Sequence, residues 1–232
     1  MDDVLVLWDI DGTLLNAGGV GRDLYDVVFL QLFGRSLSSC APMAGRTDRA
    51  IILETLALAG VAEPRRHVER FIAGLGAHAL SMRPEVASRG QALPGALAAL
   101  ALVGGHARQS VLTGNVRLLA EVKLAALGLH EGLDLRIGAY GDDHEDRAEL
   151  VELARRRAAA VHGRPPSSSF AGRSTVVIGD TPLDIAAALS AGARAVGVAT
   201  GSYPAGALAE AGAHAVLPGL ADASLVLDTL LG

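Results

Sequence analysis

A short apolar run, residues 4–8, ends abruptly in two aspartates, Asp9 and Asp11, and then in the turn dipeptide Gly12-Thr13. On an extended backbone, the side chains of residues i and i+2 point to the same face. If residues 4–8 form a buried strand, both carboxylates project from its carboxyl end into one small space. Two anions held that close repel each other unless a cation or a shared proton compensates. The pattern predicts a functional acidic site at a strand end, with a surface turn after a strand as the simpler alternative.

Apolar stretches alternate with helical patterns along most of the chain. Besides residues 4–8, the predicted strands are residues 110–112, 133–139, 175–178 and 195–198, and the predicted helices are residues 93–104, 116–127, 145–162, 183–191 and 205–211. This alternation is typical of an α/β fold in which helices cover both faces of a parallel sheet. In such sheets, ligands bind beyond the carboxyl ends of the strands. Three predicted strands end there in polar residues: Asp9 and Asp11, Thr113-Gly114-Asn115, and Gly179-Asp180.

Residues 20–88 break this alternation, because they contain helical patterns but no strand candidate. The helical patterns span residues 23–33, 48–59 and 64–80, and turn-forming residues flank the region at 16–19 and 88–91. We therefore expect a Rossmann-like catalytic core made of residues 1–17 and 90–232, and an all-helical cap, residues 18–89, inserted after the first strand. A helical insertion hinged above the strand ends would be placed to close over a substrate. A loop is expected at residues 163–172.

The composition narrows the class of protein and of ligand. Half of the 232 residues are apolar but only 3% are aromatic, so the core must be built from alanine, leucine and valine. The net charge of −5 argues against nonspecific binding of nucleic acid, which needs a basic face. The apolar stretches are too short to span a bilayer, and the acidic N-terminus does not match a secretory signal. The single cysteine, Cys40, allows no disulfide within the chain, so a cytoplasmic location is expected.

Three polar motifs occur in order, each after a predicted strand: Asp9-Ile10-Asp11-Gly12-Thr13, then Thr113-Gly114-Asn115, then Gly179-Asp180-Thr181-Pro182-Leu183-Asp184. Each motif alone is weak evidence. Their order, spacing and strand context together resemble the haloacid dehalogenase-like hydrolase superfamily, and the match covers essentially the whole chain. The insertion after the first motif resembles the helical cap of the subgroup that contains phosphoglycolate phosphatase and beta-phosphoglucomutase.

The resemblance assigns chemical roles to the first two motifs. It implies that Asp9 is the nucleophile, which attacks phosphorus and forms an aspartyl phosphate. Asp11 would protonate the leaving oxygen and then activate the hydrolytic water. Thr113, with the backbone N–H groups of Gly114 and Asn115 at a helix N-terminus, would bind phosphate oxygens. The alternative is that Thr113 or Asn115 only caps the following helix.

The resemblance also implies a Mg²⁺ cofactor. Asp180 and Asp9 would supply carboxylate ligands and Asp11 a backbone carbonyl. Because Mg²⁺ keeps several of its waters, these few protein ligands suffice. Asp184, in the same motif as Asp180, would support the site through water or neighbouring donors. The alternative is that Asp184 simply faces solvent in the first turn of a helix.

The chain departs from the superfamily pattern at the third motif, where a lysine usually precedes the last acidic motif. Arg147 falls at that place here, and a guanidinium can pair with both a carboxylate and a phosphate oxygen. Lys123 is the competing candidate, although its place on the helix after Asn115 favours a salt bridge or a contact with the cap. In the cap, Arg46 is the candidate to meet the far end of a substrate, with a solvated arginine beside a turn as the alternative.

We expect a Mg²⁺-dependent phosphatase that hydrolyses a small phosphorylated metabolite. A sugar-phosphate mutase of the same superfamily is the alternative, since it uses the same two aspartates but returns the phosphate to a substrate. A noncatalytic binding or regulatory protein that kept the fold is a further alternative, although it would not need the acid/base carboxylate. The expected partner is a small molecule, with no nucleic acid and no membrane. The substrate itself, and the choice between monomer and homodimer, stay open.

Overall fold

The computed structural model describes residues 4–163 and 170–232. Within these residues, a parallel sheet of five strands runs in the order β4-β1-β5-β6-β7. Its strands are β1 (Leu5–Trp8), β4 (Arg108–Val111), β5 (Thr175–Gly179), β6 (Arg194–Val198) and β7 (Ala215–Leu217). β1 lies between β4 and β5, and Trp8 pairs in register with Val111 and Ile178. The three polar motifs therefore leave the sheet side by side at its carboxyl end.

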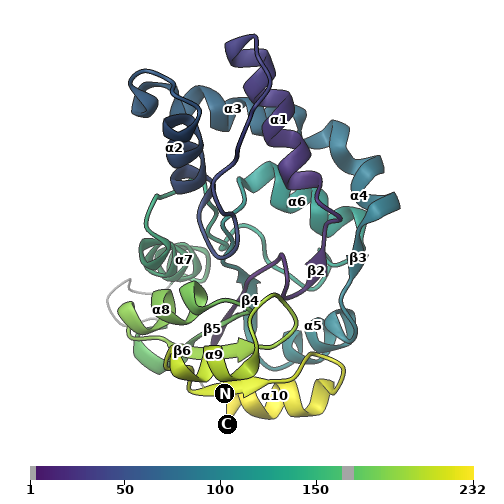
Figure 1. The fold of residues 1–232 in the computed structure, drawn as a ribbon. Helices are drawn as coiled ribbons and strands as arrows, with labels where there is room; N and C mark the ends of the chain where they lie inside the picture. The colour runs from purple at the N-terminus through teal and green to yellow at the C-terminus, as the bar shows by residue number, and fades with distance from the viewer. Residues whose placement is uncertain (1–3, 164–169) are drawn as a thin grey trace.

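Helices cover both faces of the sheet (Figure 1). Val6 and Trp8 of β1 pack in a cluster with α5 (Ala96–Gly104), α10 (Ala223–Leu231) and one side of α6 (Arg117–Ala126). Leu5 and Leu7 point to the opposite face and pack with α7 (Arg147–Val161), α8 (Pro182–Ser190) and α9 (Ala205–Glu210). Because alternate residues of a strand face opposite sides, the short strand β1 anchors both layers. The predicted α/β fold is confirmed.

One predicted strand of the core was wrong, and two elements of the core were missed. Residues 133–139 form no strand and contribute only an isolated bridge between Leu112 and Ala139. The Asp134 carboxylate accepts a hydrogen bond from the backbone N–H of Arg136, and this local turn competes with an extended backbone. β7 and α10 were not predicted. Most of the loop expected at residues 163–172 falls on residues 164–169, which lie outside the described part of the chain.

The chain leaves the core through β2 (Leu15–Asn16) and returns through β3 (Gln91–Ala92), which pair as an antiparallel ribbon. Between these strands lie α1 (Val20–Phe33), α2 (Asp48–Leu58), η1 (Pro64–His67), α3 (Val68–Ala79), η2 (Leu80–Met82) and α4 (Arg83–Arg89). The four α-helices gather at one end of the molecule, beyond the carboxyl ends of the strands (Figure 1). This region, which we call the cap, is helical as predicted. Among the helices of the described residues, none has both the length and the apolar character needed to cross a bilayer.

The cap has a hydrophobic core of its own, which is separate from the two clusters on the sheet. This core surrounds Phe29 of α1 and also includes Leu119 and Val122 of α6. The neighbouring residues of the same helix, Ala120 and Leu124, pack into the sheet cluster instead. One helix is therefore shared between the cap and the sheet.

The first turn of α2 attaches the cap to the loops of the core. The Asp48 N–H donates to the Gly114 carbonyl at 2.7 Å. The Arg49 N–H donates to the Gly141 carbonyl at 3.2 Å. A Cβ atom on Gly114 would lie 1.8 Å from the Arg46 carbonyl oxygen, so a glycine is needed for this close approach. The cap is closed against the loops that follow β4 and precede α7.

Candidate active site

Asp9 follows β1 directly, and its carboxylate is buried at the carboxyl end of the sheet. Its backbone N–H donates to the Ile178 carbonyl at 2.8 Å, which extends the pairing of β1 with β5. Oδ1 accepts a hydrogen bond from Nη2 of Arg147 at 2.7 Å. Burial and the negative charge of Asp184 raise the pKa of Asp9 well above its ordinary value, while Arg147 opposes the rise. The positive charge of Arg147 therefore favours the ionised form of Asp9.

Arg147 supplies that positive charge from the first position of α7. Nη2 lies 2.7 Å from Asp9 Oδ1 and 2.5 Å from Asp184 Oδ1. The same nitrogen donates to the Leu112 carbonyl at 3.1 Å. Burial disfavours the cation, but Asp184 and Asp9 outweigh this effect and raise the pKa of Arg147 above its already high value. The structure thus brings Arg147, the residue predicted for the third motif, into contact with Asp9.

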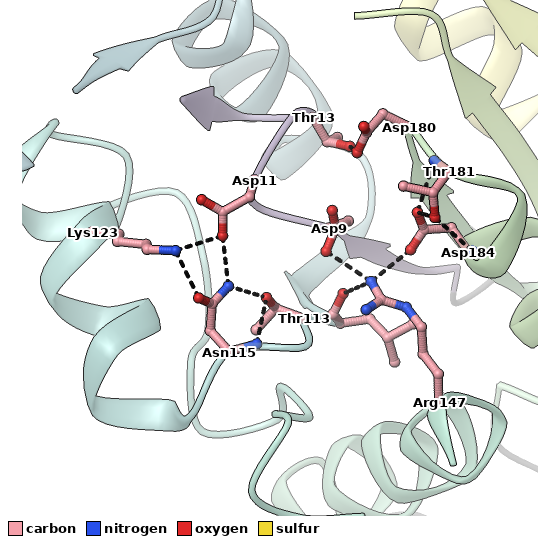
Figure 2. Close-up of polar contacts among 11 residues, drawn as sticks. Asp9, Asp11, Thr13, Thr113, Asn115, Lys123, Arg147, Asp180, Thr181 and Asp184 are labelled. Carbon is pink, nitrogen blue, oxygen red and sulfur yellow. Dashed lines mark hydrogen bonds and ion pairs between the residues drawn. The ribbon is translucent and has the colours of Figure 1, made fainter. Parts of the chain in front are cut away.

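Three buried carboxylates converge beside Arg147 (Figure 2). Asp9, Asp180 and Asp184 each offer one oxygen atom, and these atoms all lie within 4.8 Å of one another. Burial and the charge of Asp184 raise the pKa of Asp180 to about 7. When all three carboxylates are ionised, one guanidinium leaves the cluster with two uncompensated negative charges. A divalent cation with oxygen ligands fits both the charge and the donor atoms of this cluster.

Each oxygen of the Asp184 carboxylate lies beside a protein group. Asp184 Oδ1 pairs with Arg147, and Oδ2 accepts from the N–H and the hydroxyl of Thr181 at 3.0 and 2.7 Å. Thr181 caps α8 and accepts a hydrogen bond from the Asp184 N–H, so the two residues form a capping box. The alternative that Asp184 faces solvent is wrong, because its side chain is fully buried. Asp184 instead fixes the position of Arg147.

Sequence reasoning missed several residues around Asp180. The Thr13 hydroxyl donates to Asp180 Oδ1 at 3.2 Å. A Cβ atom would lie 1.7 Å from Asp180 Oδ2 if placed on Gly201, and 2.4 Å from it if placed on Gly12. The Thr200 hydroxyl donates to the Gly12 carbonyl at 2.6 Å and so joins the two loops. Thr200 follows β6, so the same search for polar residues after each strand would have found it.

Thr113 and Asn115 form a small hydrogen-bonded unit after β4. Thr113 is fully buried, and its Oγ1 accepts from the N–H and from Nδ2 of Asn115 at 3.2 and 2.8 Å. The alternative that either residue caps the next helix is wrong, because Val116 is the N-cap residue and α6 has no side-chain cap. Since Oγ1 acts as the acceptor in both bonds, the Thr113 hydroxyl hydrogen can bind a phosphate oxygen.

Asp11 forms a salt bridge with Lys123 (Figure 2). Its Oδ2 accepts from Lys123 Nζ at 2.6 Å and from Asn115 Nδ2 at 2.7 Å. The Lys123 side chain is 4% exposed, whereas that of Asp11 is 42% exposed. Lys123 therefore forms the salt bridge that its sequence position favoured, and its partner is Asp11.

Most of these side chains line one cavity of about 710 Å³ between the cap and the core. The wall on the core side includes Asp9, Asp11, Thr113, Gly114, Asn115, Lys123, Arg147 and Asp180, and the wall on the cap side includes Arg22, Tyr25, Met43, Arg46, Asp48 and Ile51. The Arg46 guanidinium pairs with Glu54 at 2.7 Å and also donates to two carbonyls of the cap. The candidate substrate contact at Arg46 thus lies in the cavity wall, with its charge already paired.

Asp48 places a further buried carboxylate where the cap meets the core. Its Oδ1 accepts from the Tyr25 hydroxyl, and Oδ2 accepts from the Val116 N–H, each at 2.7 Å. Burial raises the pKa of Asp48 to about 6, although both hydrogen bonds oppose the rise. In the sequence, a carboxylate beside a turn gives no sign of this burial.

The replacement Asp48→Asn is expected to change how stability depends on pH. A folded-state pKa above the unfolded value means that Asp48 favours folding at low pH and that this contribution is lost as pH rises through about 6. The free energy of unfolding of the variant, taken relative to that of the wild type, should therefore increase by on the order of 2 kcal/mol as the pH rises from about 4 to about 7. Urea unfolding of both proteins at several pH values measures this difference, in which the shared active-site carboxylates cancel. A difference that does not vary with pH would contradict the raised pKa.

The model of the haloacid dehalogenase-like hydrolase family matches residues 6–189, which contain the three motifs and Arg147. A comparison with curated protein sequences found no significant match. The match to the family model covers well over half of the chain.

Solved structures from several bacteria share the fold over the whole chain. A hydrolase from Pseudomonas syringae is 22% identical, with a TM-score of 0.66 and 98% of each chain covered. A predicted phosphatase from Clostridium acetobutylicum is 17% identical, with a TM-score of 0.67 and 99% of each chain covered. A candidate beta-phosphoglucomutase from Thermotoga maritima is 20% identical, with a TM-score of 0.56 and 98% of each chain covered. These structures share the fold, and the family model shows that the protein belongs to the haloacid dehalogenase-like hydrolases.

Proposed function

We propose that the protein is a phosphatase that releases inorganic phosphate from a small phosphorylated metabolite. The observation that carries this proposal is the buried contact between Asp9 and Arg147 beside Asp180, in the wall of a cavity of about 710 Å³. A carboxylate that is paired with a buried cation and open to a cavity is arranged to act as a nucleophile. The cavity volume is that of a small-molecule site.

The proposed reaction uses two steps. In the first, a carboxylate oxygen of Asp9 attacks phosphorus, the bond to the leaving oxygen breaks, and Asp11 gives that oxygen a proton. The Thr113 hydroxyl and Arg147 hold the other phosphate oxygens as charge develops on them. In the second step, Asp11 takes a proton from water, the water oxygen attacks phosphorus, and phosphate leaves Asp9 as a free carboxylate.

We further propose that Mg²⁺ binds to Asp9, to Asp180 and to the backbone carbonyl of Asp11. When bound, the ion would neutralise the carboxylates and polarise the phosphate. Asp184 supports this site indirectly, because it fixes Arg147 on one side and Thr181 on the other. The uncompensated charge of the buried cluster is what supports a divalent cation here.

Chelation of divalent cations is expected to abolish turnover. Phosphate release should be measured over a panel of phosphorylated metabolites with Mg²⁺, with Ca²⁺ and with excess chelator. Ca²⁺ should replace Mg²⁺ poorly, because it prefers more ligands and less strict geometry. Mg²⁺ should also raise the melting temperature of the metal-free wild type but not that of Asp180→Asn. Full turnover in excess chelator would overturn the metal assignment.

A sugar-phosphate mutase is the second candidate. The candidate beta-phosphoglucomutase from Thermotoga maritima has a similar fold, which is compatible with this activity. A mutase must keep water from its phosphorylated aspartate, whereas hydrolysis needs water at the acid/base residue. The Asp11 side chain is 42% exposed, which favours hydrolysis. Phosphate release from a simple phosphomonoester without added sugar bisphosphate would support the phosphatase. Interconversion of sugar phosphates without phosphate release would support the mutase, and no turnover of any compound would favour a noncatalytic protein.

A further inference from the structure

We propose that Lys123 is a positioning residue that holds the Asp11 carboxylate and the Asn115 side chain in the orientation needed for proton transfer. This inference deepens the proposed phosphatase function and rests on it, because it concerns how the acid/base group of that reaction is held. It assigns to Lys123 a task different from that of Arg147, which contacts the nucleophile.

The first observation is the burial of the Lys123 ammonium group. Its side chain is 4% exposed, and Nζ donates to Asp11 Oδ2 at 2.6 Å and to Asn115 Oδ1 at 2.7 Å. A buried cation is unfavourable unless it is paired and hydrogen-bonded. Both acceptors belong to residues of the proposed active site, so residues of that site compensate the buried positive charge.

The second observation is a closed ring of hydrogen bonds. Asn115 Nδ2 donates to Asp11 Oδ2 at 2.7 Å and to Thr113 Oγ1 at 2.8 Å, while Asn115 Oδ1 accepts from Lys123. An ammonium group can only donate, so Lys123 requires the amide oxygen to face it. The amide nitrogen must then face Asp11 and Thr113. Through Asn115, Lys123 therefore sets the orientation of the proposed acid/base group and of the proposed phosphate-binding hydroxyl.

The third observation concerns the two oxygens of Asp11. Both donors, Lys123 and Asn115, bind Oδ2, and within the described residues no protein group donates to Oδ1. The side chain is 42% exposed and lines the cavity, so its surroundings alone would not hold it in one orientation. Fixing Oδ2 leaves Oδ1 for the leaving oxygen and the hydrolytic water. Proton transfer requires the two oxygens to lie within hydrogen-bonding distance, so a carboxylate without a fixed orientation would transfer protons more slowly.

The replacement Lys123→Met keeps the length of the side chain and removes the charge and the donors. Its effect should depend on how much the leaving group needs a proton. With an alkyl phosphate, the rate of phosphoryl transfer to Asp9 should fall about 10- to 10²-fold, less than the roughly 10²- to 10⁴-fold contributed by a general acid, because Asp11 itself is retained. With p-nitrophenyl phosphate, whose leaving group needs no proton, the first step should change less than about 3-fold. Hydrolysis of the intermediate still needs Asp11, so a burst of p-nitrophenolate should appear.

Rapid-quench kinetics with both substrates measures these rates, and mass spectrometry detects phosphate on Asp9. Arg117→Met is the matched control, since Arg117 is a cation of the same helix that pairs with Glu121, and both substrates should react at wild-type rates. An equal loss with both substrates would overturn the positioning role, because loss of general structure or of phosphate contact does not distinguish leaving groups.

Two further results keep the experiment decisive. If circular dichroism shows that Lys123→Met is unfolded, Lys123→Gln keeps one amide donor and should show the same dependence on the leaving group with a smaller loss. The same loss on both substrates would again overturn the role. Absence of turnover and of phosphorylated Asp9 in the wild type, with either substrate and Mg²⁺, would instead overturn the proposed phosphatase function itself.

Discussion

Asp9→Asn is expected to reduce phosphatase turnover to background while the protein remains folded. The amide has nearly the same shape as the carboxylate but cannot attack phosphorus, so no aspartyl phosphate can form. Acid-quenched wild type should carry phosphate on Asp9, and the variant should carry none by mass spectrometry. Asp134→Asn is the matched control, since Asp134 pairs with Arg136 away from the cavity, and its kcat should stay unchanged. Turnover by Asp9→Asn at the wild-type rate would overturn the nucleophile assignment.

The same replacement is expected to raise stability at neutral pH. Burial and Asp184 raise the pKa of Asp9, so its ionised form opposes folding once the pH exceeds its unfolded-state pKa. Removing that charge should increase the free energy of unfolding by about 1 kcal/mol, a size common for stabilising changes at active sites. The gain should shrink as the pH is lowered, because Asp9 is then protonated in the wild type. Loss of stability at neutral pH would show that the ion pair between Asp9 and Arg147 stabilises the fold by more than burial and carboxylate repulsion destabilise it.

Arg147→Met is expected to lower kcat by about 10²-fold or more, because it removes a fixed donor where charge develops on the phosphate. It should also destabilise the fold by roughly 3–5 kcal/mol, since Asp9 and Asp184 would lose their buried partner. Rapid kinetics at a temperature well below the melting point separates the two effects. Arg157→Met, on the same helix and paired with Asp143, should leave kcat near the wild-type value.

Arg147→Lys tests what the arginine contributes beyond its charge. Lysine restores a positive charge but donates from a single nitrogen, whereas the guanidinium donates from several nitrogens in a fixed plane. The kcat should therefore recover only in part. Full recovery would show that charge alone matters at this position. A wild-type kcat for Arg147→Met would return the third-motif role to Lys123, which contacts Asp11 at 2.6 Å in this structure.

The convergence of Asp9, Thr113 and Asp180 could be predicted from the sequence because each follows a strand, and parallel neighbouring strands bring their carboxyl ends together. Arg147 could be placed because the superfamily pattern has a basic residue ahead of the last acidic motif, and Arg147 falls at that place in the sequence. The convergence follows from the periodicity of the strands, whereas the roles assigned to these residues rest on the resemblance to the superfamily. The β-strand predicted at residues 133–139 failed because an Asp side chain can stabilise a turn as readily as an apolar run favours extension.

The pairing of side chains across the site could not be predicted in the same way. Lys123 and Asp11 are 112 residues apart, and nothing in either local pattern indicates that they meet. Likewise, the burial of Asp48 depends on Tyr25 from another cap helix and on the Val116 backbone of the core. Such contacts arise from packing between elements, whereas the sequence patterns report on one element at a time.

The two-sided packing of α6 limits how freely a cap can be exchanged between relatives or by protein engineering. A graft cut at the proposed boundaries, residues 18–89, would remove α1–α4 but leave Leu119 and Val122 as an apolar surface matched only to the original cap. A foreign cap would have to be redesigned to fit that surface, or would have to bring its own version of α6. Because α6 also carries Lys123, the second choice would replace the residue that holds Asp11. Under the proposed mechanism, an exchange of the cap together with α6 would therefore also change how Asp11 is held.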